Sequence, residues 1–441
     1  MPTKRVVLAE YFTTDDRTLL FIVRADFNEP QVVEIQVPLA EVRQFVATHF
    51  SVGARGSKVS GLDLEAWQAL FGSIVEPILP WTDEGDIVWL VPHDVLHYLP
   101  LHALKVEGDY FIKRNPICYT PSASVMKYCQ AKRKGRRERA LILADSRSNL
   151  PLLHAREQAL AIQRLFAPHA EVYLGGVATK ALVKQRLAEA KDDFDVLHFA
   201  CHGYFYPHQA LRSGIMLAPG NHRVPTQEDT EGLRITEVDG SEWNLTAEEI
   251  FSLELRADLV TLSACESGVN ERRPGDELIG LTRAFIYAGT PSVLVSLWNV
   301  DELSTSVLMH EFYQQLLRSS TTKVEALQRA QLHLQDLSVA DALRYIEHMS
   351  TRHDLDAPAQ AYLHLTKAKM LLKACDYPAA QAAFQEVLML EELDHQSRRQ
   401  ARAGVENASL GAQAGVAMNY HCCLYEDPYY WAPFILVGDW K

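Results

Sequence analysis

Two apolar stretches decide the fold: FDVLHFACHG at residues 194–203 and LVTLSACESG at residues 259–268. Each runs from aliphatic and aromatic residues directly into a reactive side chain and then a glycine. Such continuous apolar runs are typical of parallel strands that are buried on both faces. In open parallel sheets, ligands bind beyond the carboxyl ends of the strands, and neighbouring strands lie only about 5 Å apart. If these two strands are neighbours, His202 and Cys265 therefore face one cleft.

The segments on either side of these strands alternate between strand and helix patterns. Short apolar runs predict further strands at 140–144, 171–174 and 292–298. Helical spacing predicts helices at 155–166, 180–190, 277–288 and 303–317. Capping-box patterns at Thr246 and Thr322 mark two further helix starts. This alternation predicts an α/β fold, with a mostly parallel sheet that is covered by helices and complete by about residue 337.

The chain divides into four predicted parts. Residues 1–130 are expected to form an N-terminal α/β module that begins with a hairpin, its strands at 18–23 and 32–37. Residues 131–339 hold the central sheet and form the expected catalytic module. Residues 340–425 carry almost no strand signal, and the helix pair at 359–374 and 379–392 resembles a tetratricopeptide-type repeat. Residues 426–441 are very apolar and are expected to return to the sheet as its terminal strand.

The composition excludes several classes of protein. The chain has 441 residues, of which 48% are hydrophobic and 22% charged, and this excludes disorder as the main state. A net charge of -13 argues against a nucleic-acid binder, although the basic stretch 127–139 is either a solvated linker or a local contact. No run of 18 apolar residues occurs, so we expect a cytoplasmic protein without a membrane segment. Seven irregularly spaced cysteines indicate reduced thiols.

His202 and Cys265 point to nucleophilic catalysis. An imidazole, whose ordinary pKa is about 6.5, can take the proton of a thiol at neutral pH. The backbone N–H groups of Gly203 and Cys265 could then hold an oxyanion. Two other interpretations stay open here: Cys265 as a buried core cysteine, and His198, Cys201 and His202 as metal ligands. Strand alternation places Cys201 on the face opposite the two histidines, and no fourth ligand follows, so we expect no metal.

Four further motifs occur in order along the chain: VPHDVLHYLPL at 91–101, YTPS at 119–122, SLWNV at 296–300 and YWAPF at 430–434. With these motifs the chain resembles the CHAT domain proteins, bacterial caspase-like cysteine peptidases of the caspase, metacaspase and separase clan. The resemblance implies a caspase-hemoglobinase-like fold, with His202 as general base and acid, Cys265 as nucleophile, and no cofactor. Two residues separate Cys265 from the next glycine, whereas caspases have one, so the caspase preference for aspartate is not carried over.

The resemblance also implies a reaction and its partners. It favours an endopeptidase that cleaves protein substrates through a thioester acyl-enzyme, in bacterial defence or regulated proteolysis. The candidate substrate contacts lie near predicted strand ends and helix starts: Asp195, Ser263, Asp276, Ser296, Trp298, Asn299, Asp301 and Glu302. The alternative is a non-catalytic caspase-like scaffold. In both cases the helical insert is the expected site of a protein partner, because a single helix pair cannot bury its own apolar face.

Overall fold

The computed structural model describes residues 5–49, 64–144, 152–189, 194–204, 210–220, 243–263, 276–298, 300–350, 357–391, 393 and 395–441. The chain forms two compact units. Unit 1 comprises Met1–Leu332 and Pro428–Lys441, and unit 2 comprises His333–Asp427. The helical region predicted at 340–425 falls inside unit 2, whereas a division of unit 1 at residue 130 stays a prediction.

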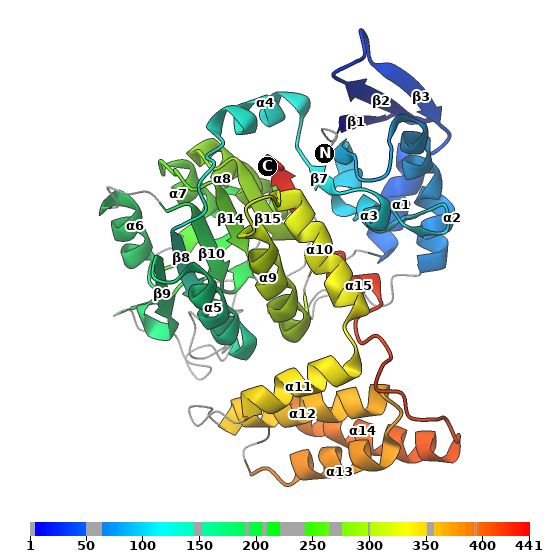
Figure 1. The fold of residues 1–441 in the computed structure, drawn as a ribbon, viewed down its shortest axis with the longest axis vertical. Helices are drawn as coiled ribbons and strands as arrows, with labels where there is room; N and C mark the ends of the chain where they lie inside the picture. The colour runs from blue at the N-terminus through cyan, green and yellow to red at the C-terminus, as the bar shows by residue number, and fades with distance from the viewer. Residues whose placement is uncertain are drawn as a thin grey trace, which may run out of the picture. The chain divides into compact units, whose positions relative to one another are not determined.

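Within the described residues, eleven strands of unit 1 form one sheet, in the order β3-β2-β1-β4-β7-β16-β15-β14-β10-β8-β9 (Figure 1). Their bounds are β1 (Val6–Thr13), β2 (Thr18–Arg24), β3 (Gln31–Ile35), β4 (Ile87–Val91), β7 (Ile117–Tyr119), β8 (Ala140–Ala144), β9 (Ala170–Leu174), β10 (Val196–Ala200), β14 (Leu259–Leu262), β15 (Ser292–Ser296) and β16 (Phe434–Gly438). Two small sheets join β5 (Lys105–Val106) to β6 (Asp109–Tyr110), and β11 (Gly203–Tyr204) through β12 (Gly214–Ile215) to β13 (Leu245–Thr246).

The central strands β8, β10, β14 and β15 are parallel neighbours. Their carboxyl ends therefore meet at one edge of the sheet, which is the place where ligands bind in such sheets. β16 lies antiparallel to β15 and parallel to β7, so it joins the N-terminal strands to the central ones. The predicted α/β fold with a mostly parallel sheet is confirmed, and the predicted neighbours β10 and β14 are paired directly.

Helices cover both faces of the central strands. The ring of His198 lies 5.4 Å from that of Tyr313, and the ring of Phe199 lies 6.1 Å from that of Phe285. Because successive strand residues point to opposite faces, α9 covers one face and α8 the other. α5 packs beside α9 (Figure 1). The helices of unit 1 are α1 (Leu39–His49), α2 (Leu64–Val75), α3 (Phe111–Arg114), α4 (Ala123–Lys132), α5 (Leu153–Phe166), α6 (Lys180–Glu189), α7 (Ala247–Phe251), α8 (Asp276–Ala288), α9 (Glu302–Leu316), α10 (Lys323–Asp336), which runs on into unit 2, and α15 (Pro428–Trp431), with 3-10 turns at Glu76–Trp81, Asp94–Tyr98, Leu101–Ala103, Gly175–Val177 and Ala210–Arg212.

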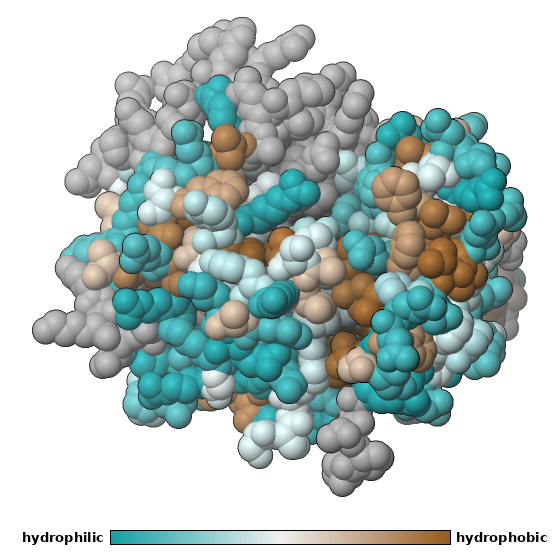
Figure 2. Space-filling model, turned by 90° about the horizontal axis from the view of Figure 1, so that it is seen from above, coloured by the Kyte–Doolittle hydropathy of each residue, from teal (hydrophilic) through white to brown (hydrophobic). Residues whose placement is uncertain are grey.

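The N-terminal strands form an antiparallel edge of the sheet. The predicted hairpin is confirmed as β2 and β3, but β1 is not predicted, although it pairs with both β2 and β4. One face of this edge packs inward, where the Tyr11 hydroxyl donates to the carbonyl of Ile74 in α2 at 3.1 Å. Phe12, Val23 and Val32 are exposed on these strands. Seen from above, apolar areas of the surface are separated by hydrophilic ones (Figure 2).

Two arginines of the basic stretch 127–139 are bonded to the rest of unit 1. The Arg133 guanidinium donates to Asp439, with Nε 2.6 Å from Oδ2. Arg137 donates to two main-chain carbonyls at and after the end of α9, at 2.9 and 2.8 Å. Arg133 and Arg137 therefore use their cations inside the fold, whereas Lys127, Lys132 and Arg136 of the same stretch are exposed, as in a solvated linker.

The described secondary structure of unit 2 is helical, apart from an isolated antiparallel bridge between Ser338 and Cys423. Its helices α11 (Val339–Ser350), α12 (Ala357–Lys373), α13 (Tyr377–Leu388) and α14 (His395–Gln413) pack on one another in sequence order. The predicted helix pair corresponds to α12 and α13. Asp376 caps α13 by accepting the N–H of Ala379 at 3.2 Å. A Cβ atom at Gly404 would lie 2.4 Å from the ring of Phe384, so glycine permits the close approach of α14 to α13.

Candidate active site

His202 lies just beyond the carboxyl end of β10 and is buried, with 4% of its surface exposed. Its carbonyl accepts the N–H of Met216 at 2.8 Å, and the next residue, Gly203, pairs with Ile215 of β12. Hydrogen-bonded and non-hydrogen-bonded pairs alternate along an antiparallel ladder. Since His202 and Met216 are hydrogen-bonded, the next pair, Gly203 and Ile215, is a non-hydrogen-bonded one. The N–H of Gly203 therefore points away from β12.

Ser263 lies just beyond the carboxyl end of β14, next to the end of β10. Its N–H donates to the carbonyl of Phe199 at 2.9 Å, which extends the pairing of the two strands by one step. Its hydroxyl lies 3.1 and 3.2 Å from the side-chain amide atoms of Gln158 in α5. The Gln158 amide also donates to the carbonyl of Thr305 in α9 at 3.4 Å. Ser263 is thus fixed by a buried side-chain bond between strand and helix.

The connection from β15 to α9, residues 297–301, leaves the same edge of the sheet on the far side of β14. It follows Ser296, which is 8% exposed and lies opposite Phe434 of β16. The indole N–H of Trp298 donates to the carbonyl of Tyr429 at 3.0 Å. Asp301 is the N-cap of α9 and accepts the N–H of Ser304 at 2.9 Å. These contacts hold the connection at both of its ends.

Glu302, the first residue of α9, is joined to α5. Its Oε2 accepts the N–H of His154 at 3.3 Å. Burial lowers the pKa of the His154 imidazole to about 4, so this ring is neutral at pH 7. The sequence reasoning missed both His154 and Gln158. The available signal was their spacing of four residues, which places both on one face of the predicted helix.

Asp195 lies at the opposite end of β10 from His202. Its carboxylate accepts the N–H groups of Glu138 and Arg139 at 2.7 and 3.0 Å. Its carbonyl accepts the N–H of Asp258 at 2.8 Å. The five residues of β10 separate it from the edge where His202 lies, so it is not carried further as a substrate contact.

His198 and Cys201 take part in packing. Nδ1 of His198 lies 3.0 Å from the Tyr313 hydroxyl, which donates to the hydroxyl of Thr261 at 2.7 Å. Burial lowers the pKa of His198 to about 3. The buried Cys201 thiol lies 3.6 Å from the carbonyl of Leu143. Over the described ranges, no group of three or more His, Cys, Asp or Glu side chains is placed to hold a metal ion.

Three predicted site residues cannot be placed from their side chains. Cys265 and Asn299 lie outside the described residues, and for Asp276 only the backbone is described, as the first residue of α8. Of the predicted set, the structure brings His202, Ser263, Ser296, Trp298, Asp301 and Glu302 to the carboxyl edge of the central strands.

A protein-family model covers most of the chain. The model described as "CHAT domain" matches residues 64–439. The chain belongs to the CHAT domain family. The match runs from α2 to the residue after β16, so the N-terminal strand β4, the central strands and the helical unit all lie within the CHAT region.

Curated relatives of this CHAT chain are much longer than it is. It is 28% identical over 237 residues to Tetratricopeptide repeat protein 28 of Homo sapiens, which covers 49% of this chain and 9% of that protein. It is 30% identical over 205 residues to the Mus musculus protein of the same name, which covers 41% of this chain and 8% of that protein. The CHAT chain therefore spans less than a tenth of the length of either relative.

Two solved structures are similar to the CHAT chain. The Saccharomyces cerevisiae separase–securin complex matches with a TM-score of 0.49 and 9% identity, over 74% of this chain and 29% of that one. The Arg-specific cysteine proteinase gingipain R matches with a TM-score of 0.36 and 11% identity, over 66% of this chain and 69% of that one.

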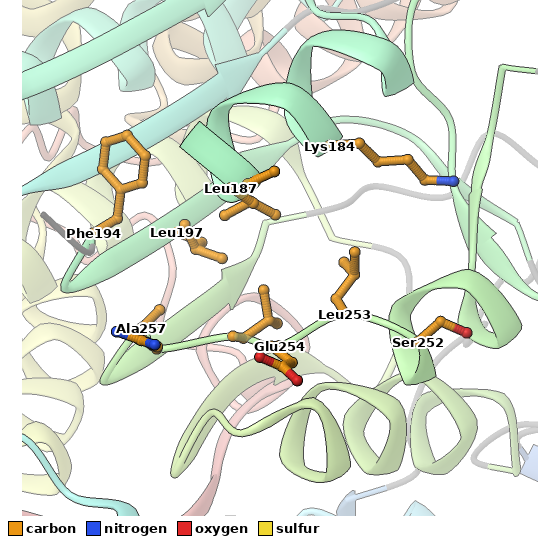
Figure 3. A pocket seen from close by; sticks show the side chains of 11 residues that line it. Lys184, Leu187, Phe194, Leu197, Ser252, Leu253, Glu254 and Ala257 are labelled. Carbon is orange, nitrogen blue, oxygen red and sulfur yellow. The ribbon is translucent and has the colours of Figure 1, made fainter. Parts of the chain in front are cut away.

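A separate cavity of about 460 Å³ lies near the amino ends of β10 and β14 (Figure 3). It is lined by Lys184 and Leu187 of α6, by Leu197 of β10 and by residues 252–257. Since His202 follows the other end of β10, this cavity is not part of the candidate active site. Among the helices of the described chain, none is long and apolar enough to cross a membrane.

Proposed function

We propose that this CHAT chain is a cysteine endopeptidase in which Cys265 is the nucleophile and His202 the general base and acid. The observation that carries the proposal is the register of the two strands that precede these residues. β10 and β14 are parallel, and each of the four paired residues of β10 lies opposite the residue 63 positions later, as Val196 with Leu259 and Phe199 with Leu262. Cys265 is 63 positions after His202. If this register continued for three more residues, the two side chains would lie at the same point of the sheet edge.

The direction of the Gly203 N–H supports an oxyanion site beside His202. This N–H points away from β12, because Gly203 belongs to a non-hydrogen-bonded pair. We assign it, with the N–H of Cys265, to the oxygen that becomes negative when a thiolate attacks a carbonyl. Donors that are already oriented toward a developing charge typically contribute several kcal/mol to catalysis, about 3 to 4 per donor where this has been measured.

The proposed reaction is acyl transfer in two steps. His202 takes the thiol proton of Cys265, and the sulfur bonds to the carbonyl carbon of the scissile peptide. The carbon–nitrogen bond then breaks as His202 gives the proton to the leaving amine, which leaves a thioester. In the second step His202 takes a proton from water, the resulting hydroxide displaces the sulfur, and the Cys265 thiol regains a proton. Its bacterial defence or regulated-proteolysis setting stays a prediction.

The decisive experiment compares the wild type with Cys265→Ala and maps the new protein N-termini that each produces in a cell extract. Labelling with a peptidyl acyloxymethyl ketone, which alkylates activated thiols, provides a second readout. We expect cleavage and labelling by the wild type, and a loss of at least a thousandfold in Cys265→Ala, since removal of a covalent nucleophile costs several orders of magnitude.

Cys201→Ala is the matched control, because it removes a buried thiol from the same sheet edge without touching the proposed dyad. It should keep the activity. Equal cleavage by the wild type and Cys265→Ala contradicts the proposal. If Cys201→Ala abolishes cleavage and Cys265→Ala does not, Cys201 is the nucleophile and the proposal is wrong. A wild type that neither cleaves nor labels leaves the non-catalytic scaffold as the better function.

For unit 2 we propose a regulatory protein partner. Its helices pack in sequence order, as in helical repeats whose surfaces bind proteins. The curated relatives, which are named as tetratricopeptide repeat proteins, support the same kind of partner.

A further inference from the structure

The β15–α9 connection, residues 297–301, is placed to form the flank of the proposed cleft opposite His202. Three neighbouring strands decide this: β10, β14 and β15, in that order. His202 follows β10, the proposed nucleophile follows β14, and the connection follows β15. Neighbouring strands are about 4.8 Å apart, so a peptide that crosses the end of β14 meets both flanks within the length of a few residues.

This flank is attached to the segment that precedes β16. Leu297 donates its N–H to the carbonyl of Pro433 at 2.8 Å, and Trp298 donates its indole N–H to the carbonyl of Tyr429 at 3.0 Å. Only 8% of the surface of Trp298 is exposed. The indole is therefore turned toward the fold, and its predicted role as a substrate contact stays a prediction.

The segment that accepts these bonds is itself held firmly. The side-chain amide of Gln331 in α10 donates to the carbonyls of Trp431 and Phe434 at 2.9 and 3.0 Å. The Trp431 ring is fully buried, and its centroid lies 5.0 Å from that of Tyr110. Residues 429–434 thus form a fixed support, to which the indole N–H of Trp298 and the backbone N–H of Leu297 attach the start of the β15–α9 connection.

We propose that Trp298 is a positioning residue that sets the substrate-binding flank of the cleft through its bond to the Tyr429 carbonyl. The inference rests on the proposed peptidase function. The indole does not touch the reacting atoms; it fixes where the connection stands relative to the end of β14. Loss of the N–H should therefore weaken substrate binding and leave the chemical step nearly unchanged, which is the kinetic signature of lost uniform binding.

The test is Trp298→Phe, which keeps an aromatic ring and removes the donor. We expect KM for a mapped cleavage sequence to rise about fivefold, with kcat within about twofold of the wild type. A fivefold change corresponds to about 1 kcal/mol, the usual net value of one hydrogen bond. Replacement of Trp298 by benzothienylalanine, in which sulfur takes the place of the indole N–H, removes the same donor while keeping the ring shape, and should give the same rise in KM.

Trp89→Phe is the matched control. The Trp89 indole is fully buried in β4 and also donates to a tyrosine carbonyl, that of Tyr119, at 3.4 Å. Three strands separate β4 from β14, so this variant loses the same type of bond far from the proposed cleft. It should leave KM unchanged, even if it lowers the melting temperature.

The outcomes separate the two proposals. If the wild type cleaves and Trp298→Phe behaves like Trp89→Phe in KM, the positioning role is wrong while the peptidase stands. If the phenylalanine variant fails to fold, the benzothienylalanine variant decides, and an unchanged KM there overturns the inference. If the wild type has no thiol-dependent cleavage, the proposed function fails and this inference fails with it.

Discussion

Lys323→Met removes a fully buried cation from the edge of the sheet that lies opposite the candidate active site. Nζ of Lys323 lies 2.7 Å from Oδ2 of Asp258 and 3.8 Å from Oδ2 of Asp439, and it donates to the hydroxyl of Ser292 at 2.8 Å. These partners stand before β14, after β16 and at the start of β15. One side chain of α10 thus joins the ends of three strands.

The expected cost is about 3 to 5 kcal/mol of unfolding free energy. Burial lowers the pKa of Lys323, and the two aspartates oppose this shift, so the ammonium depends on them for its charge. Asp439 keeps Arg133 as a partner when the lysine is removed, whereas the carboxylate of Asp258, which is 1% exposed, loses its cation. A buried charge left without its partner typically costs about 3 to 5 kcal/mol.

Urea unfolding, monitored by tryptophan fluorescence, reports on unit 1, because no tryptophan of the chain lies within 333–427. Lys323→Met combined with Asp258→Asn should recover at least half of the loss. The asparagine oxygen can still accept the N–H of Lys134, which Asp258 accepts at 2.8 Å. Arg17→Met is the matched control, since it removes an equally short ion pair, to Glu34, from the exposed surface and should leave the unfolding midpoint nearly unchanged.

Two results would refute the reasoning. A loss below about 1 kcal/mol in Lys323→Met would mean that Asp258 is not left as an uncompensated buried charge. Purely additive effects in the double variant would mean that the lysine and the aspartate do not interact, whatever their distance.

Two further predictions concern pH and the helical unit. Burial lowers the pKa of His198 to about 3, so between pH 6.5 and 3 the unfolded chain binds a proton at this residue that the folded chain does not. The contribution of His198 to stability should therefore fall by up to about 1.4 kcal/mol per pH unit on acidification. His198→Gln should lower the pH slope of urea unfolding between pH 7 and 5 by that amount, while the slope from other buried histidines, such as His154, remains. Replacement of residues 341–419 by a short Gly-Ser linker should leave the fluorescence-detected unfolding midpoint unchanged and alter the rate or selectivity of cleavage. Unchanged rate and selectivity would show that the helices neither regulate nor recognise.

The central strands could be predicted from the sequence because each is buried on both faces and reads as one apolar run. β8 matches its predicted bounds, and β10 and β14 lie within the apolar stretches 194–203 and 259–268 from which they are predicted. The capping box at Thr246 is also confirmed, because its bonds join residues only three positions apart. β1 was missed, since what makes it a strand is its pairing with β2 and with the distant β4.

The candidate site shows the same limit. His202 could be predicted because it follows an apolar strand directly, so that strand topology alone brings it to the carboxyl edge. Asp195 precedes the same strand, so it lies at the amino end of β10, at the opposite edge of the sheet. Gln158 and His154 act at the edge from a helix that lies more than forty positions earlier in the chain than His202. Their contacts could not be predicted from the sequence, because they depend on the packing of α5 against α9.

Unit 2 is inserted in the chain between β15 and β16, two neighbouring strands of the sheet in unit 1. The two ends of unit 2 are joined by backbone hydrogen bonds: Leu424 donates to Leu337 at 2.8 Å, and Ala340 donates to the carbonyl of Tyr420 at 2.9 Å. The chain therefore enters and leaves unit 2 at nearly one point. β16 can then pair with β15 although many residues separate them in the chain. Within unit 1, Gln331 donates to the carbonyls of Trp431 and Phe434, and the carbonyl of Tyr429 accepts the indole N–H of Trp298. A displacement of residues 429–434 would therefore act on both α10 and the β15–α9 connection.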